Sequence, residues 1–324
     1  MKYTELGHTG INVSRICVGG MSFGRIVEGG HRWLLDQEQT TSMIAEAFDQ
    51  GVNFIDTANQ YAAGSSEEFI GRALKDLGIA RDKVVIASKV YFNEGHLSRK
   101  AILREIEGTL TRLQTDYLDL YQIHRFDYDT PIEETMEALH DLVIAGKVRA
   151  IGASAMYGYQ FHNMQLCAHA HGWTSFSAMQ NHYNLLYRED ERELIPVCEQ
   201  YEVSRIPYSP LAGGHLTHTG WRSGSRRSDT DKILAHKYDM YEQEDLAIID
   251  RVSEVAEKHG VSMTQVALAW QYCKGVAAPI VGATKAAHFK DACKAVDLVL
   301  NDEDVKYLEE LYTVRQLVGL IQHG

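Results

Sequence analysis

The sequence predicts an α/β fold of the (β/α)8 TIM barrel class, with an N-terminal β-hairpin and extra C-terminal helices. Short apolar runs alternate with amphipathic stretches along almost the whole chain, which is typical of a parallel sheet whose strands are joined by helices. Eight such units fit the 324 residues, since a barrel of this class takes about 250 residues plus insertions. No linker rich in Pro, Gly or Ser divides the chain, so we expect residues 1–324 to form a single domain.

The expected elements begin with the hairpin over Tyr3–Val13, whose turn is Gly7-His8-Thr9-Gly10. The eight strands are expected at Ile16–Gly19, Asn53–Ala58, Val84–Val90, Leu118–His124, Ala150–Ala153, Ala178–His182, Ser204–Tyr208 and Pro279–Gly282. Helical patterns fall near 40–50, 66–78, 99–113, 133–145, 159–171, 189–201, 245–258, 263–273, 286–295 and 302–313. The patterns at 263–273 and 302–313 are additional to the eight units.

Local patterns indicate where some helices begin and which segments are irregular. The capping-box pattern at a helix start is met by two pairs: Ser65 with Glu68, and Ser262 with Gln265. Long irregular segments at Met21–Gln37 and Pro210–Gln243 follow the first and seventh strands. Because both follow strand C-termini, both should lie on the face of the barrel where active sites form.

Composition and charge exclude several classes of function. With 45% hydrophobic and 23% charged residues the chain is an ordinary globular protein, without a membrane span or a membrane partner. Its net charge of -12 disfavours binding to nucleic acid. The 5 cysteines form no C-x-x-C pair, which argues against a disulfide framework and a zinc cluster. Since no apolar segment follows the N-terminal lysine, we expect no secretory signal and a cytoplasmic protein.

Four ionisable side chains stand at the C-terminal ends of strands two to four, where a barrel brings neighbouring strand ends together. Asp56, Lys89 and His124 each end an apolar run, and Tyr61 follows in the next loop. A carboxylate stabilises a buried ammonium group, which in turn favours the phenolate of a neighbouring tyrosine. Such a tyrosine can protonate a carbonyl oxygen that a histidine orients. The four residues therefore predict reduction of a C=O group, with a separate hydride donor.

Longer motifs make the chain similar to the aldo-keto reductases over essentially its whole length. They are Leu6–Gly10 with Val13-Ser14, Gly51–Ala58 reaching Tyr61, Ala87–Lys89, Asp116–His124, Gly146–Arg149 and Tyr208–Leu211. The segments His124–Pro131 and Gln180–Arg188 resemble the bacterial branch related to potassium-channel β subunits. The resemblance implies an oxidoreductase that reduces aldehydes or ketones with a nicotinamide cofactor, usually NADPH. It also implies that Tyr61 is the proton donor, that Lys89 and Asp56 tune it, and that His124 orients the carbonyl.

The cofactor residues follow from the same resemblance, because Gly19–Gly24 lacks the G-x-G-x-x-G spacing of a Rossmann fold. Ser154 and Gln180 would hydrogen-bond the carboxamide, and Tyr208 would stack on the nicotinamide ring. Other expected cofactor contacts are Gly20, Met21, Ser209, Leu211, Gly213, Gly282, Thr284, Lys285 and His288, with Arg222, Arg226 and Arg227 as candidate phosphate clamps.

The segment Gly282–Lys285 precedes a helix N-terminus, a natural anion site. Thr284 and Lys285 resemble the hydroxyl and basic residues that hold a 2′-phosphate, which favours NADP(H) over NAD(H). Three positions depart from the family pattern: His288 and Ala292 stand where Gln and Asn are common, and Ala155 replaces a common Asn. NAD(H) therefore stays open as the less favoured cofactor.

Aromatic and basic residues on the expected mouth loops are candidates for the substrate pocket: Trp33, Tyr91, Phe92 and Arg125. The histidines at 169, 171, 215 and 218 lack a cysteine or carboxylate that would complete a ligand set, so we expect no metal site. The expected partner is a small carbonyl substrate, and self-association into a homo-oligomer stays open.

Two other functions compete with a carbonyl reductase. The chain could be a slow-turnover, cofactor-binding subunit that senses redox state and acts through a protein partner, because channel-associated relatives share the four residues. It could also be a barrel lyase that uses Lys89 as a Schiff-base nucleophile. Asp56 opposes the lyase, since a neighbouring carboxylate keeps the amine charged.

Overall fold

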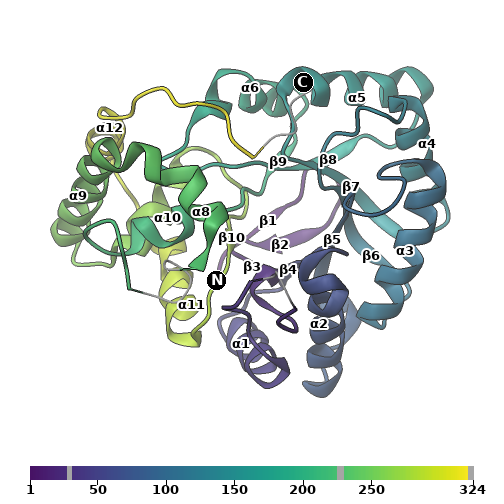
Figure 1. Cartoon of the computed structure of the whole chain (residues 1–324), viewed down its shortest axis with the longest axis horizontal. Coiled ribbons are helices and arrows are strands. Elements are labelled where there is room, and N and C mark those ends of the chain that lie inside the picture. The colour runs from purple at the N-terminus through teal and green to yellow at the C-terminus, as the bar shows by residue number, and fades with distance from the viewer. Residues whose placement is uncertain (28–30, 225–229, 320–324) are drawn as a thin grey trace.

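The computed structural model describes residues 1–27, 31–224 and 230–319, and it shows a parallel sheet rolled into a barrel inside a layer of helices (Figure 1). The strands of the barrel are β3 (Cys17–Gly19), β4 (Phe54–Asp56), β5 (Val85–Val90), β6 (Leu118–Ile123), β7 (Val148–Ser154), β8 (Phe176–Gln180), β9 (Ser204–Arg205) and β10 (Ile280–Val281). Each strand from β3 to β9 pairs with the next, and β10 pairs with β3. The Ile280 N–H donates to the Pro207 carbonyl at 2.9 Å, which closes the ring. The predicted (β/α)8 fold is confirmed.

The helices match the expected patterns with three differences, of which one is that the last helix, expected at 302–313, ends at Glu309. The helices are α1 (Gln37–Asp49), α2 (Ser65–Asp76), α3 (Arg99–Leu113), α4 (Ile132–Ile144), α5 (Gly158–His171), α6 (Leu194–Gln200), α8 (Lys232–Tyr238), α9 (Glu242–His259), α10 (Met263–Cys273), α11 (Ala286–Cys293) and α12 (Asp302–Glu309). The expected helix at 189–201 is shorter, because Pro196 has no N–H and its ring would collide with the carbonyl of residue 192. The irregular segment Pro210–Gln243 contains α8, which Asp231 caps through the amides of Ile233 and Leu234.

The N-terminal hairpin closes the N-terminal end of the barrel. Its strands β1 (Tyr3–Glu5) and β2 (Asn12–Ser14) pair antiparallel. Leu6, Ile11 and Val13 are buried among apolar side chains that point into the barrel. The hairpin turn is also bonded to β9, since the Gly7 N–H donates to Ser204 Oγ at 2.7 Å. Because the hairpin covers the N-terminal end of the barrel, a functional site would lie at the opposite, C-terminal end of the strands.

The predicted caps are found in part. Ser262 caps α10 by accepting the Gln265 N–H at 3.2 Å, but the Gln265 amide bonds Asp291 instead of returning to the cap. The predicted pair Ser65 and Glu68 is wrong. The cap of α2 is Gly64, which has a φ of 85°, and Ser65 Oγ donates back to the Ala62 carbonyl at 2.6 Å.

Candidate active site

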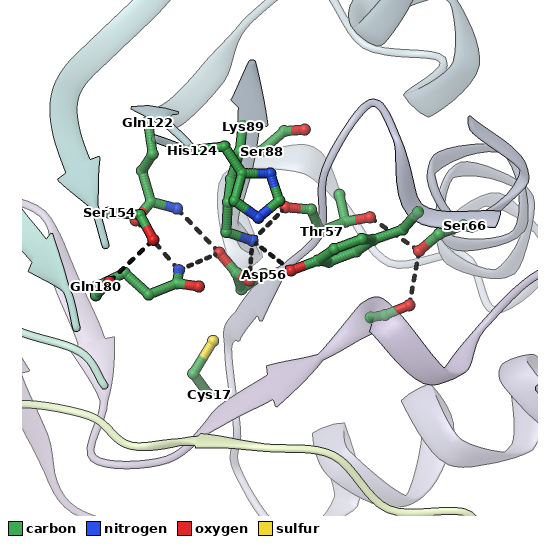
Figure 2. A network of polar contacts seen from close by, with 12 residues as sticks. Cys17, Asp56, Thr57, Ser66, Ser88, Lys89, Gln122, His124, Ser154 and Gln180 are labelled. Atoms are coloured by element: carbon green, nitrogen blue, oxygen red, sulfur yellow. Dashed lines mark hydrogen bonds and ion pairs between the residues drawn. The ribbon is translucent and has the colours of Figure 1, made fainter. Parts of the chain in front are cut away.

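The four predicted residues lie together: Asp56, Lys89 and His124 stand at the C-terminal ends of β4, β5 and β6 (Figure 2). Tyr61 joins them from the following turn, with its Oη 3.1 Å from Lys89 Nζ. Asp56 is the last residue of β4, Lys89 is the penultimate residue of β5, and His124 directly follows β6. Parallel pairing of these three strands aligns their ends. Tyr61 begins the short turn, residues 61–64, that leads from β4 towards α2.

Lys89 is fully buried, and its ammonium group has a partner for each proton. Its Nζ donates to three oxygen atoms: Asp56 Oδ1 at 2.5 Å, the Thr57 carbonyl at 2.8 Å and Tyr61 Oη at 3.1 Å. Burial alone would lower the pKa of Lys89, but the charges and hydrogen bonds of Asp56 and Tyr61 outweigh it and raise that pKa. The amine is therefore held protonated beside the tyrosine hydroxyl.

Gln122 belongs to the same cluster and was not predicted. Its Nε2 donates to Asp56 Oδ2 at 2.9 Å, and Gln180 Nε2 donates to the same oxygen at 2.9 Å. The buried carboxylate thus has hydrogen bonds on both oxygens. A signal was present in the sequence, because Gln122 lies two residues before His124 and residues at that spacing share a face of a strand.

His124 is buried beside Tyr61. The two rings meet edge to face, with centroids 5.7 Å apart, and Phe92 contacts the same imidazole at 5.1 Å. Burial, together with the positive charges of Lys89 and Arg125, holds the pKa of His124 well below its ordinary value. Its Nδ1 has no hydrogen-bond partner among the described residues. A neutral imidazole here can donate one hydrogen bond to a carbonyl oxygen.

The backbone after Tyr61 has a left-handed conformation that non-glycine residues seldom adopt. Ala62 and Ala63 have φ values of 48° and 54°. Such residues cost on the order of 1–3 kcal/mol each and persist only where the surrounding structure holds them. Gly24 packs against this turn, since a Cβ atom there would lie 2.5 Å from Ala62 Cβ. The turn fixes the direction in which the Tyr61 side chain leaves the backbone.

The two expected carboxamide residues lie next to the cluster. Ser154 ends β7 and Gln180 ends β8, and Ser154 Oγ donates to the Gln180 carbonyl at 2.9 Å. Gln180 also reaches Asp56, so this side of the site is bonded directly to the Lys89 cluster. Gly20 is buried behind Asp56, where a Cβ atom would lie 2.9 Å from the Asp56 carbonyl oxygen, and Met21 is partly exposed beside it.

Tyr208 follows β9 by three residues and makes contacts that the sequence did not predict. The ring of His182 is parallel to it at 5.1 Å, and Lys237 Nζ of α8 lies 4.8 Å from its centroid. The Tyr208 hydroxyl and His182 Nδ1 are buried without a hydrogen-bond partner among the described residues. The next turn includes the expected pyrophosphate residues Ser209, Leu211 and Gly213, and α8 packs on it: a Cβ atom on Gly213 would meet Leu234 Cδ1 at 2.0 Å.

The remaining cofactor candidates lie farther from the cluster. Gly282, Thr284, Lys285 and His288 are exposed around the start of α11. Lys285 makes no ion pair with any residue that the structure describes. Arg222 pairs with Asp239 at 2.9 Å, and Arg226 and Arg227 lie outside the described residues.

The substrate candidates differ in exposure. Trp33 is buried beside His31, with centroids 4.8 Å apart, and Tyr91 is buried against His96 at 4.7 Å. Phe92 is 43% exposed and Arg125 is partly exposed. Phe92 and Arg125 are therefore the two candidates that present surface beside His124.

Comparison with known proteins agrees with this arrangement. Residues 15–313 match the model of the aldo/keto reductase family. The chain belongs to this family. It is 40% identical to the versiconal hemiacetal acetate reductase of Aspergillus parasiticus, over 98% of each chain. It is 41% identical to an aldo-keto reductase of Fusarium vanettenii, over 98% of this chain and 92% of the other.

A third relative, from Schizosaccharomyces pombe, carries a name of the aryl-alcohol dehydrogenase type and is 42% identical over 98% of each chain. With the family and these relatives, the chain is an oxidoreductase. In the part of the chain that the structure describes, no helix has the length and apolar character needed to cross a membrane.

Proposed function

We propose that the chain reduces an aldehyde or ketone to an alcohol by hydride transfer from NADPH, with Tyr61 as the proton donor. The observation that carries this proposal is the contact of 3.1 Å between Lys89 Nζ and Tyr61 Oη, inside a cluster that Asp56 neutralises. The named relatives support carbonyl chemistry, since one is a reductase of a hemiacetal acetate and another is named for aryl alcohols.

The residues at the site fit a nicotinamide cofactor. The buried hydroxyl of Tyr208 and the buried Nδ1 of His182 have no partner among the described residues. Ser154 Oγ bonds the Gln180 carbonyl, and the side-chain amide of Gln180 bonds Asp56. When bound, the cofactor supplies the hydride. Ser154 and Gln180 would hold its carboxamide, Tyr208 its ring, and Thr284 with Lys285 its 2′-phosphate.

The protein's own residues would act on the carbonyl oxygen. Tyr61 gives a proton to that oxygen as negative charge develops on it, and the Lys89 ammonium stabilises the phenolate that remains. His124, held neutral, donates a hydrogen bond that orients the carbonyl. Asp56 keeps Lys89 charged throughout, so the cluster changes charge only at the tyrosine.

The competing functions gain no support. A Schiff-base lyase needs a neutral amine. At Lys89 the charges and hydrogen bonds of Asp56 and Tyr61 outweigh burial and raise the pKa, so the amine stays charged. No observation favours the redox-sensing subunit.

The relation to the bacterial branch near potassium-channel β subunits stays a proposal from the two motifs that begin at His124 and Gln180. We also propose a cytoplasmic location, for which the five free cysteines are the support.

The substitution Tyr61→Phe tests the proposed function. We expect kcat for benzaldehyde reduction to fall by roughly 10²–10⁴-fold, the usual contribution of a positioned acid. The Kd for NADPH, measured by calorimetry, should change less than about twofold, because the hydroxyl acts on the substrate. Tyr159→Phe is the control, because Tyr159 is an exposed tyrosine on α5, and its turnover should stay unchanged. Unchanged turnover in the Tyr61 variant would defeat the assignment.

A further inference from the structure

We propose that this active site selects aromatic carbonyl compounds that carry an anionic group, and that Arg125 binds this anion. The inference rests on the proposed function and names the substrate class of the same site. Three observations carry it: the missing counter-ion of Arg125, the balance of charge around it, and the exposed ring beside it.

Arg125 is a partly buried cation whose charge is not neutralised by the protein. Its Nη1 donates to the adjacent His124 carbonyl at 2.7 Å, which fixes the guanidinium beside the catalytic cluster. It forms no ion pair with any carboxylate among the described residues. The nearest acid along the chain, Asp127, bonds the Leu97 amide at 3.0 Å and Thr130 Oγ1 at 2.7 Å instead. A guanidinium offers five N–H donors, so most remain available to a ligand.

The other charged groups of the site do not cancel this positive charge. Lys89 and Asp56 neutralise each other. His124 and His182 are held neutral by burial, and the charge of Arg125 contributes at both histidines to their lowered pKa values. Asp127 and Asp129 also lie near enough to act on Tyr91 together with Arg125, but neither forms an ion pair with Arg125 among the described residues. The guanidinium beside the carbonyl-orienting His124 is therefore open to an anionic ligand.

An aromatic surface joins the reacting position to this charge. The Phe92 ring contacts the His124 imidazole at 5.1 Å, and the guanidinium carbon of Arg125 lies 5.6 Å from the centroid of the same ring. Phe92 is 43% exposed, and the ring of Tyr91 meets it edge to face with centroids 5.0 Å apart. A planar ring lying on Phe92 would place its carbonyl at His124 and a distant carboxylate at Arg125.

The anion is assigned to the substrate and not to the cofactor because of where Arg125 lies. The residues expected to hold the cofactor phosphates follow β9 and β10, whereas Arg125 follows β6. Its only described hydrogen bond is to His124, the residue that contacts the proton donor Tyr61.

Paired substrates test the inference in the full-length protein. Kinetics with 4-formylbenzoate and its neutral methyl ester give a ratio of kcat/KM that reports the anion alone, and the 3-formyl pair is run in parallel. We expect the acid to be preferred by about tenfold or more in one pair, the size of a hydrogen bond to a charged group. Arg125→Gln should reduce that ratio to near one, and Arg125→Lys should restore part of it.

The control is Arg72→Gln, which removes the same charge from the exposed surface of α2, where Arg72 pairs with Asp76 at 3.4 Å. It should leave the ratio unchanged. A ratio near one in the unmodified protein, or an equal ratio in the Arg125 and Arg72 variants, overturns the inference. The inference is also overturned if Arg125→Gln weakens NADPH binding by as large a factor as it lowers kcat/KM for the acid. The guanidinium would then bind the cofactor.

A binding measurement separates this inference from the proposed function. Calorimetric titration with 4-(hydroxymethyl)benzoate needs no turnover, and we expect Arg125→Gln to weaken its binding by about tenfold. If no aldehyde is reduced but this loss is found, the proposed function fails and the anion site stands. Equal binding of the alcohol to both proteins refutes the anion site even where the aldehydes are reduced.

Discussion

Lys285 is the exposed side chain on which the proposed preference for NADPH depends most directly. It precedes α11, and its ammonium makes no ion pair with any described residue, although Asp and Glu outnumber Lys and Arg by 44 to 32 in the chain. An exposed cation without an ion pair can bind a phosphate without first breaking a contact to a carboxylate, and a helix N-terminus adds to the attraction.

We predict that Lys285→Ala weakens the binding of NADPH by about tenfold, the loss expected for one hydrogen bond to a charged group. The affinity for NADH, which lacks the 2′-phosphate, should fall by less than about twofold. Fluorescence titration of both cofactors checks this, with Lys290→Ala on the same helix as the matched control. Equal losses for the two cofactors would mean that the 2′-phosphate is held elsewhere.

The sequence predicted the position of the four ionisable residues but not the amides around them. A charged residue at the end of an apolar run is conspicuous, and barrel geometry then dictates that Asp56, Lys89 and His124 converge. Gln122 is uncharged and lies inside the run, so its one signal is that it shares a strand face with His124, two residues later. The approach of Lys237 to Tyr208 joins segments that no local pattern connects.

Among the elements, α2 and α3 pack so closely that one glycine sets their distance. Gly71 lies inside α2, and a Cβ atom there would be 2.6 Å from the Leu113 carbonyl oxygen at the end of α3. The obstacle is backbone, which cannot rotate away. Since α2 follows directly from the turn that carries Tyr61, this contact also supports the active site.

We predict that Gly71→Ala destabilises the protein by roughly 1–3 kcal/mol, because overpacking outweighs the gain of about 1 kcal/mol in helix propensity. Urea denaturation gives the free energy of unfolding. Gly108→Ala in α3 is the control, since its Cβ atom would meet only the flexible end of Arg112, at 2.9 Å from Nη1. The control should be neutral or slightly stabilising, and a stabilised Gly71 variant would contradict the packing argument.

Element types were predictable because strands and helices repeat with different periods, whereas boundaries depended on backbone detail. The helix patterns at 99–113 and 263–273 agree with α3 and α10 to the residue. The start of α2 did not follow its sequence pattern, because the left-handed turn before it makes Gly64 the cap. Helix α8 was not predicted, since it lies in a polar segment and is held by contacts with the Gly213 turn.

For the whole molecule, buried titratable groups make stability depend on pH in both directions. Burial lowers the pKa of His215 to about 4, so below the ordinary value of about 6.5 the unfolded chain binds protons that the folded chain does not. Stability from this group is thus lost as the pH falls from about 6.5. Burial raises the pKa of Asp190 and of Asp245 to about 7, so those carboxyls favour the folded state as the pH falls.

Because these effects oppose each other, the prediction concerns a difference between two proteins. His215→Asn keeps a donor for the Trp221 carbonyl, which His215 Nδ1 contacts at 3.1 Å, and cannot titrate. Between pH 7 and 5 the variant should lose about 1–2 kcal/mol less stability than the unmodified protein. Urea denaturation at both pH values measures this, with the exposed His8→Asn as control. Identical pH dependence in all three proteins would refute it.

The closure of the ring between β10 and β3 has a consequence for synthesis on the ribosome. Cys17 of β3 pairs with Ile280, so one edge of the first barrel strand stays unpaired until a segment far later in the chain has been translated. The nascent chain therefore exposes an apolar strand edge for most of its translation, a state in which such chains can aggregate. The native barrel becomes attainable only after Ile280 and Val281 have been translated and have left the ribosome.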